Sequence, residues 1–272
     1  MKYIIALLVL SITTASFGQR HTNTSKSELG FLVGGTYYLG DLNQFVPFKN
    51  THLAGGLVYR YNVHSRLSLR ANIMYGKVSA SDAASNSEFQ QERNLSFSSE
   101  IYEAGIGVEF NYFPFQLGHD RYKGTAYLLA ELAVFRMNPK ASYNGSEVAL
   151  RDLGTEGQGT SLNSKSYYNL TQLSIPLGVG AKLSLGDRVG LNVECGIRKT
   201  FTDYLDDVGA NAYVDPVVLA AENGPLSAEL SNLSGNQYGQ RGNTLTKDWY
   251  VFTGMMITFR LGKPATCFYQ DN

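Results

Sequence analysis

Apolar and polar residues alternate along eight separate segments of the chain, the first of which begins near residue 28. In that segment Leu29, Phe31 and Val33 share one side of an extended strand, and the even-numbered residues share the other. The same period of two predicts seven further strands, at residues 53–61, 67–77, 99–113, 125–137, 169–184, 189–199 and 247–260. Most of these segments reach the roughly 9–11 residues that a tilted strand needs to cross a bilayer.

The connections between these segments alternate between long and short. The long ones are residues 40–51, 78–98, 138–168 and 200–246, and the short ones are 62–66, 114–124 and 185–188. Alternate connections of an antiparallel sheet lie on the same side, and only a closed barrel satisfies the backbone hydrogen bonds of a sheet in lipid. The pattern therefore predicts an all-β, eight-stranded antiparallel transmembrane β-barrel with long extracellular loops and short periplasmic turns.

The N-terminus has the features of an export signal. A positive start at Lys2 precedes an apolar run at residues 4–12 and the small residues Ser16 and Gly18, so residues 1–18 are predicted to be a signal peptide. An inner-membrane anchor helix is the alternative, but the apolar run is shorter than the roughly 18 residues such a helix needs. Export of a barrel indicates the cell outer membrane.

This topology divides the mature chain into three parts. We expect a periplasmic N-terminal segment at residues 19–27, the barrel at residues 28–260 and a periplasmic C-terminal tail at residues 261–272.

Composition narrows the classes of function. The chain has 23 basic and 23 acidic residues and no basic run, which gives no reason to expect a nucleic-acid partner. Its 28 Gly, 18 Tyr and 14 Phe suit tightly packed strands with aromatic belts, although a soluble β-sandwich can have similar numbers. The asymmetry of the loops is therefore the stronger argument for a membrane barrel.

One face of the predicted strands is apolar and suits contact with lipid. On it lie Ile106, Val108, Phe110, Leu128, Ala130, Leu132, Val134, Val251, Thr253, Met255 and Ile257. Aromatic residues on this face fall near the strand ends, with Tyr37, Tyr75, Tyr102 and Trp249 at the outer end and Tyr61, Tyr112 and Phe259 at the inner end. They predict two interfacial belts, and an ordinary aromatic core is the alternative.

The opposite face carries four bases and four acids. They are Arg60, Arg70, Lys182, Arg198, Glu103, Glu109, Glu131 and Glu194. Because a lumen of eight strands has room only for side chains, we expect these charges to pair into a buried ion network that fills it, which disfavours a diffusion pore. Carboxylate pairs could also perform acid–base catalysis, but no substrate fits a filled lumen, so we expect neither enzymatic activity nor a cofactor.

An aspartate cluster and one cysteine could each have a functional or a structural role. Asp203, Asp206 and Asp207 could bind calcium at the outer rim, but a hydrogen-bonded loop base is preferred, and no metal site is expected. Cys195 lies on the lipid-facing side of its strand and is expected to act as a small hydrophobe. The remainder of the loop at residues 200–246 matches no motif.

Several short motifs resemble one family. They are ELGFLVGGTYYLGDLN at residues 28–43, ERNLSF at 92–97, YNG at 143–145, LRDLGTEGQG at 150–159 and TFTDYLDDV at 200–208. In this order and spacing the chain resembles the PorG-type outer-membrane proteins of the type IX secretion and gliding machinery of Bacteroidota. The resemblance implies a small, non-enzymatic barrel whose partners are a periplasmic ring lipoprotein and its associated ring subunit, and which ties that ring to the outer membrane.

Two other functions remain open. One is an adhesion or surface-binding barrel that uses its extracellular loops, and the other is an outer-membrane enzyme with an active site at the rim. A secretion anchor needs a recognition surface on the inner turns and tail, an adhesin needs one on the outer loops, and an enzyme needs converging polar side chains.

Cys267 belongs to the tail that follows the last strand. A lone thiol in an oxidising compartment often pairs with another chain, and the family resemblance supplies a ring lipoprotein as the partner. A disulfide to that lipoprotein and a free tail thiol are both open interpretations.

Overall fold

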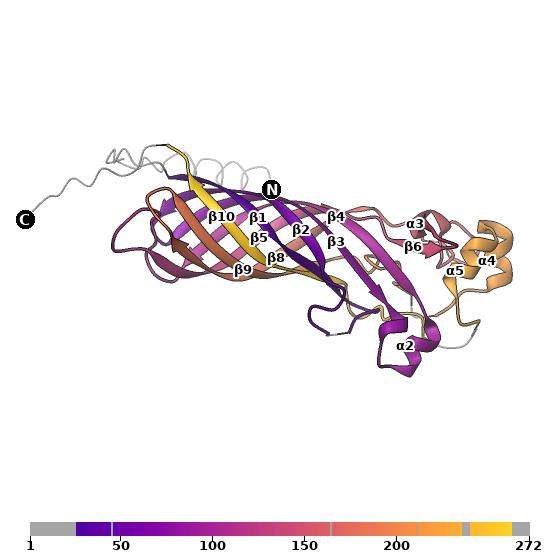
Figure 1. Ribbon diagram of the computed structural model, residues 1–272. Helices are drawn as coiled ribbons and strands as arrows, with labels where there is room; N and C mark the ends of the chain where they lie inside the picture. Colours follow the sequence, from indigo (N-terminus) through magenta and orange to yellow (C-terminus); the bar gives the residue numbers. More distant parts are fainter. Residues whose placement is uncertain (1–25, 45, 164, 211, 236–239, 263–272) are drawn as a thin grey trace, which may run out of the picture.

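A computed structural model describes residues 26–44, 46–163, 165–210, 212–235 and 240–262. Eight long strands form the barrel wall: β1 (Ser27–Leu39), β2 (His52–His64), β3 (Leu67–Ser81), β4 (Ser96–Asn111), β5 (Gly124–Arg136), β8 (Thr171–Ser184), β9 (Val189–Thr200) and β10 (Trp249–Arg260). Their hydrogen-bonded order is β3-β2-β1-β10-β9-β8-β5-β4, and the pairing of β3 with β4 closes the ring (Figure 1). All neighbours are antiparallel, so the fold predicted from the sequence is confirmed.

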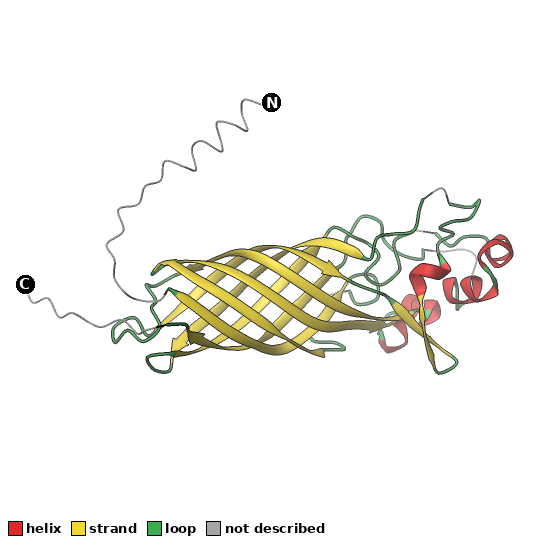
Figure 2. Ribbon diagram, turned by 90° about the horizontal axis from the view of Figure 1, so that it is seen from above, coloured by secondary structure: helices red, strands yellow, loops and turns green. Residues whose placement is uncertain are grey.

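The two ends of the barrel differ. The start of β1 and the end of β10 lie at one end with the short connections, and the helices of the described residues lie at the other end (Figure 2). β3 and β4 extend beyond the predicted segments toward that second end, where they pair as far as Ser81 and Ser96. No helix in the described part of the chain is long and apolar enough to cross a membrane.

The long connections contain regular elements that the period of two does not predict. They are η1 (Asp82–Ala84), α2 (Glu88–Arg93), the hairpin of β6 (Lys140–Tyr143) and β7 (Ser146–Ala149), α3 (Leu150–Leu153), α4 (Pro216–Asn223) and α5 (Pro225–Ser231). Helix α4 begins where the Asp215 side chain accepts hydrogen bonds from the amides of Val217 and Val218 at 2.8 and 3.3 Å, with Pro216 in the first turn. A glycine at φ +95° then separates it from α5.

The exterior of the barrel is apolar, as the alternation predicts. Ile106 and Leu132 are 68% and 67% exposed, and Tyr75 and Tyr102 are exposed near the outer end with ring centroids 5.1 Å apart. Cys195 is exposed on this surface, where its sulfur accepts a hydrogen bond from the Thr253 hydroxyl at 3.3 Å.

Two residues assigned to the lipid-facing side are buried instead. Tyr37 is covered because the first loop folds back and places the Phe48 ring 5.2 Å from it. Val251 is buried because it stands in register between the larger side chains of Tyr37 and Ile197. The connection at residues 40–51 therefore covers this part of the exterior.

Three predictions concern residues outside the described ranges. These are the signal peptide at residues 1–18, nearly all of the segment at 19–27, and most of the tail at 261–272, which includes Cys267.

Replacing Val108 or Leu132 by Arg is expected to impair insertion, because a cation at mid-bilayer on such a barrel costs about 2–4 kcal/mol. The measurement is the folded fraction after refolding into phospholipid vesicles. Ser146→Arg, at the exposed first residue of β7, is the control and should refold like the unmodified chain. Equal refolding of all three variants would contradict the assignment of the lipid-facing side.

Candidate functional site

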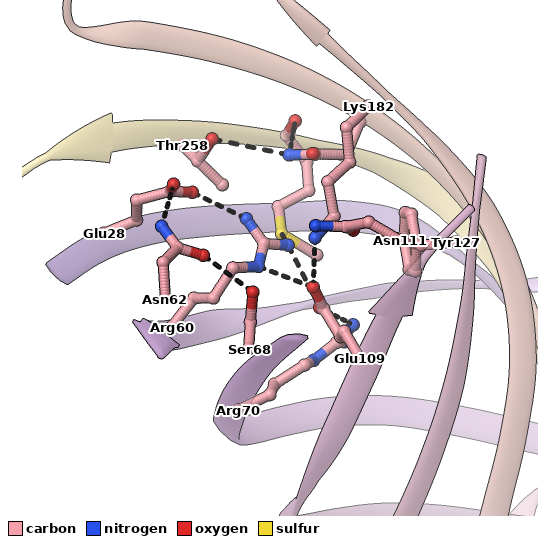
Figure 3. A network of polar contacts seen from close by, with 12 residues as sticks. Glu28, Arg60, Asn62, Ser68, Arg70, Glu109, Asn111, Tyr127, Lys182 and Thr258 are labelled. Atoms are coloured by element: carbon pink, nitrogen blue, oxygen red, sulfur yellow. Dashed lines mark hydrogen bonds and ion pairs between the residues drawn. The ribbon is translucent and has the colours of Figure 1, made fainter. Parts of the chain in front are cut away.

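The barrel interior is the most highly charged part of the protein. The eight lumen side chains predicted from the sequence all point inward, and each is at most 4% exposed. They come from six strands, β2, β3, β4, β5, β8 and β9, and part of the cluster is shown in Figure 3. The closed ring therefore brings together charges that are up to 138 residues apart, between positions 60 and 198.

Glu109 is the centre of the part of this network that lies nearer the inner end of the barrel. Its Oε2 lies 2.7 Å from Nε of Arg60 and its Oε1 lies 3.0 Å from Nη1 of Arg70 (Figure 3). The Lys182 ammonium also contacts Oε2. One carboxylate thus faces three cations from three other strands.

Arg70 links this cluster to the next one. Besides Glu109, its guanidinium pairs with Glu131 at 3.1 Å and with Glu194. The Tyr127 hydroxyl donates a hydrogen bond to Glu194 at 2.7 Å. Tyr127 fits because Gly180 faces it, where an added Cβ would lie 2.4 Å from the ring.

The remaining pair lies closer to the outer end. Nε of Arg198 is 3.5 Å from Oε2 of Glu103, and the Tyr250 hydroxyl donates to the same oxygen at 2.5 Å. The Arg198 guanidinium also lies 5.3 Å from the centroid of the Phe252 ring, a cation–π arrangement.

The structure adds a fifth acid to the four that the sequence analysis counted. Glu28 at the start of β1 is 2% exposed, and its Oε2 lies 2.7 Å from Nη1 of Arg60. Asn62 donates to its other oxygen at 2.6 Å. Glu28 shares the even-numbered face of the first segment, so the alternation itself could have identified it. Arg260 at the end of β10 stands in register with Glu28 and is also buried, at 7% exposed. In the described part of the wall, the expected balance of four against four therefore becomes five acids and five bases.

The inner mouth is covered by the longest of the short connections, residues 112–123. Phe115 and Leu117 are buried, and the Phe115 amide donates to the Ser65 carbonyl at 2.9 Å. The Phe115 ring lies 5.9 Å from the Lys182 ammonium, which belongs to the lumen network. This turn therefore contacts the charged interior directly.

The outer mouth is covered by a second polar network, which we call the outer cap. Arg93 pairs with both oxygens of Asp82 at 2.7 and 2.8 Å and donates to the backbone carbonyls of Asp41 and Arg241. Arg241 in turn pairs with Glu156. Two buried arginines thus join all four long connections.

The three aspartates considered for calcium are part of this cap. Asp203 pairs with Lys247 at 3.0 Å, Asp206 accepts from Tyr38 at 2.6 Å, and Asp207 accepts from Tyr168 at 2.6 Å. In the described part of the chain, no group of three or more His, Cys, Asp or Glu is arranged to hold a metal ion. These contacts are those of a hydrogen-bonded loop base.

A single hydroxyl stands between two buried carboxyls in the cap. The Tyr38 oxygen lies 2.6 Å from Asp206 and 2.7 Å from Asp248. One hydroxyl proton serves only one of these contacts, so the second requires a proton on a carboxyl. Burial, together with neighbouring carboxylates, raises the pKa of both Asp206 and Asp248.

A closed eight-stranded barrel with an apolar exterior and a charged, filled interior defines an integral β-barrel protein of the bacterial outer membrane. The chain belongs to the family described as "Domain of unknown function (DUF6089)", which matches residues 2–219. Among curated proteins, no sequence matches the chain.

Solved structures of similar fold include three surface or outer-membrane proteins. Neisserial surface protein A is 10% identical, with a TM-score of 0.43, over 87% of this chain and 98% of that one. The attachment invasion locus protein Ail of Yersinia pestis is 9% identical, with a TM-score of 0.41, over 87% and 97%. The outer membrane protein OprG of Pseudomonas aeruginosa is 7% identical, with a TM-score of 0.37, over 88% and 98%.

Glu109→Gln is expected to destabilise the barrel by about 3–5 kcal/mol, because it removes the charge that faces three buried cations. The free energy of unfolding, measured by urea titration in lipid vesicles, reports this loss. Glu147→Gln is the matched control, because Glu147 pairs with Lys140 at 3.3 Å on the surface, where such pairs contribute about 1 kcal/mol or less. Equal losses in the two variants would show that the lumen charges are not structurally coupled.

The outer cap is expected to be more stable at pH 5 than at pH 7.5. Burial raises the pKa of Asp41 and of Asp207 to about 6, so the folded cap binds protons more tightly than the unfolded loops do. The stability gained by protonation is fully present below pH 3.8, the ordinary pKa of an Asp carboxyl, and is lost as the pH rises from there through about 6. Between pH 5 and pH 7.5 each of the two carboxyls contributes about one pKa unit, the equivalent of tenfold. We therefore expect protease cleavage in residues 200–246, normalised to an unfolded substrate, to be about a hundredfold faster at pH 7.5.

Asp207→Asn should weaken this pH dependence, whereas Asp120→Asn in the exposed inner turn should leave it unchanged. A cleavage rate independent of pH in the unmodified chain would contradict the role of these carboxyls.

Proposed function

We propose that this barrel is a PorG-type component of the type IX protein secretion machinery of Bacteroidota. In this role it is non-enzymatic and anchors a periplasmic ring, made of a lipoprotein and its associated subunit, to the outer membrane. The observation that carries the proposal is that the lumen is filled by paired charges and covered at both mouths, so the barrel acts through its surfaces.

The positions of the family-like motifs support the proposal. Asp41, Arg93, Glu156 and Asp207 come from four different motifs, and all four lie in the outer cap. The motifs that carry the resemblance therefore meet in one connected structural unit, the outer cap.

The inner surface carries a small excess of positive charge. In the inner connections at residues 65–66, 112–123 and 185–188, the exposed bases Arg66, Arg121, Lys123 and Arg188 outnumber the exposed acids Asp120 and Asp187. A cationic surface of this kind favours a partner with an acidic patch. In the sequence, Cys267 follows β10, whose last residue lies at this end. We propose that Cys267 forms a disulfide with a cysteine of the ring lipoprotein.

The experiment is purification of the tagged chain from native membranes in mild detergent, with identification of the proteins that accompany it. We expect the ring lipoprotein and its partner to accompany the unmodified chain, and their recovery to fall at least fivefold in Arg121→Glu/Lys123→Glu. The control is Glu88→Lys/Glu92→Lys on the outer helix α2, which reverses two charges at the opposite end. Unchanged recovery in the inner variant would contradict a docking role for the inner turns.

Non-reducing electrophoresis of the same material tests the disulfide. A heavier band is expected that disappears on reduction and in Cys267→Ser and persists in Cys195→Ser. A monomer band alone in all samples would remove this role from Cys267.

An adhesion or surface-binding barrel is the second candidate, and one observation favours it. The cap and the loop beside it present apolar side chains at the outer end, with Val217 74% exposed and Leu245 91% exposed. In this case the outer variant, and not the inner one, would lose its binding partner.

A further inference from the structure

A continuous row of side chains crosses the outer part of the barrel exterior. Gly55, Tyr75, Tyr102, Arg136 and Thr171 are paired in register across β2, β3, β4, β5 and β8. Tyr75 and Tyr102 belong to the outer aromatic belt, so the row lies at the height of the lipid headgroups. It places a guanidinium in this belt.

A groove of about 490 Å³ lies along this row. The next exterior row toward the membrane centre supplies Leu57, Ile73, Ala104 and Val134 to its wall. Ala104 and Gly55 have little or no side chain, so the surface is lower between the larger residues around them. The groove is therefore apolar at its membrane side and cationic at its headgroup side.

Arg136 is available to an anion. It is exposed, and none of the ion pairs in the described part of the chain includes it. The nearest acid of the same face of β4, Glu100, stands in register with Lys77 and accepts a hydrogen bond from the Tyr75 hydroxyl at 3.3 Å. Thr171 adds an exposed hydroxyl beside Arg136.

We propose that this groove binds one phosphorylated lipid of the outer leaflet. The guanidinium of Arg136 matches a phosphate with two parallel hydrogen bonds, and the Thr171 hydroxyl lies beside it. An acyl chain occupies the groove over Ala104, between Ile73 and Val134. The tyrosine pair flanks the headgroup at the interface.

The test uses native mass spectrometry of the full chain, refolded into micelles that contain equal amounts of phosphatidic acid and of diacylglycerol with the same acyl chains. We expect one retained phosphatidic acid per barrel and at least fivefold less retained diacylglycerol. Arg136→Gln should reduce retention of phosphatidic acid at least fivefold. Lys199→Gln is the matched control, because Lys199 is an exposed cation in register with Trp249 of the same belt and does not line the groove.

Ala104→Leu provides a second, independent variant, since it fills the groove without changing any charge. It should reduce retention of the lipid as well, and inorganic phosphate at millimolar concentration should not displace the lipid from the unmodified chain. Equal retention of the two lipids, equal loss in Arg136→Gln and Lys199→Gln, or unchanged retention in Ala104→Leu would each overturn the proposal.

Discussion

The pairing of buried charges inside the lumen is the constraint on which the rest of the structure depends. A guanidinium or carboxylate removed from water is costly unless an opposite charge and hydrogen bonds accompany it. Here Arg60, Arg70 and Glu109 satisfy one another only if β2, β3 and β4 hold one register. If the register of one of these strands shifted by one residue, its charged side chains would face the lipid. The polar interior therefore specifies the pairing of the wall, beyond what the apolar exterior requires.

The same interior requires small residues as much as charged ones. Gly107 on β4 stands where an added Cβ would lie 2.6 Å from the Glu131 side chain, and Gly180 leaves the room that Tyr127 occupies. These glycines of the inward face thus make space for long side chains of the neighbouring strands. This explains why a narrow barrel can hold five acids and five bases at once.

The barrel could be predicted from the sequence because each strand has its own pattern of alternation, which is a local property. The inward positions of Arg60 and Glu109 follow from that pattern, and so does that of Glu28 on the even-numbered face of the first segment. The burial of Tyr37 could not be predicted, because it depends on the Phe48 ring of a loop without periodicity. Likewise, the helix caps at Asp215 and Pro216 are visible in the sequence, but the docking of α4 and α5 depends on contacts with residues about 70 positions away, such as the one between Asn223 and Leu153. Local patterns specify the wall, and long-range contacts specify the cap.

The outer cap has a consequence for how other proteins recognise the outer end of the barrel. Arg93 and Arg241 join backbone from loops that are distant in sequence, and the hydroxyl of Tyr38 connects Asp206 to Asp248 beneath them. An antibody or a bacteriophage receptor-binding protein that approaches from outside meets one composite surface, not four independent peptides. Immunisation with a single linear loop would then raise antibodies against a shape that the folded protein does not display. Escape from recognition could arise by repacking of the buried arginines, with no change at any exposed residue.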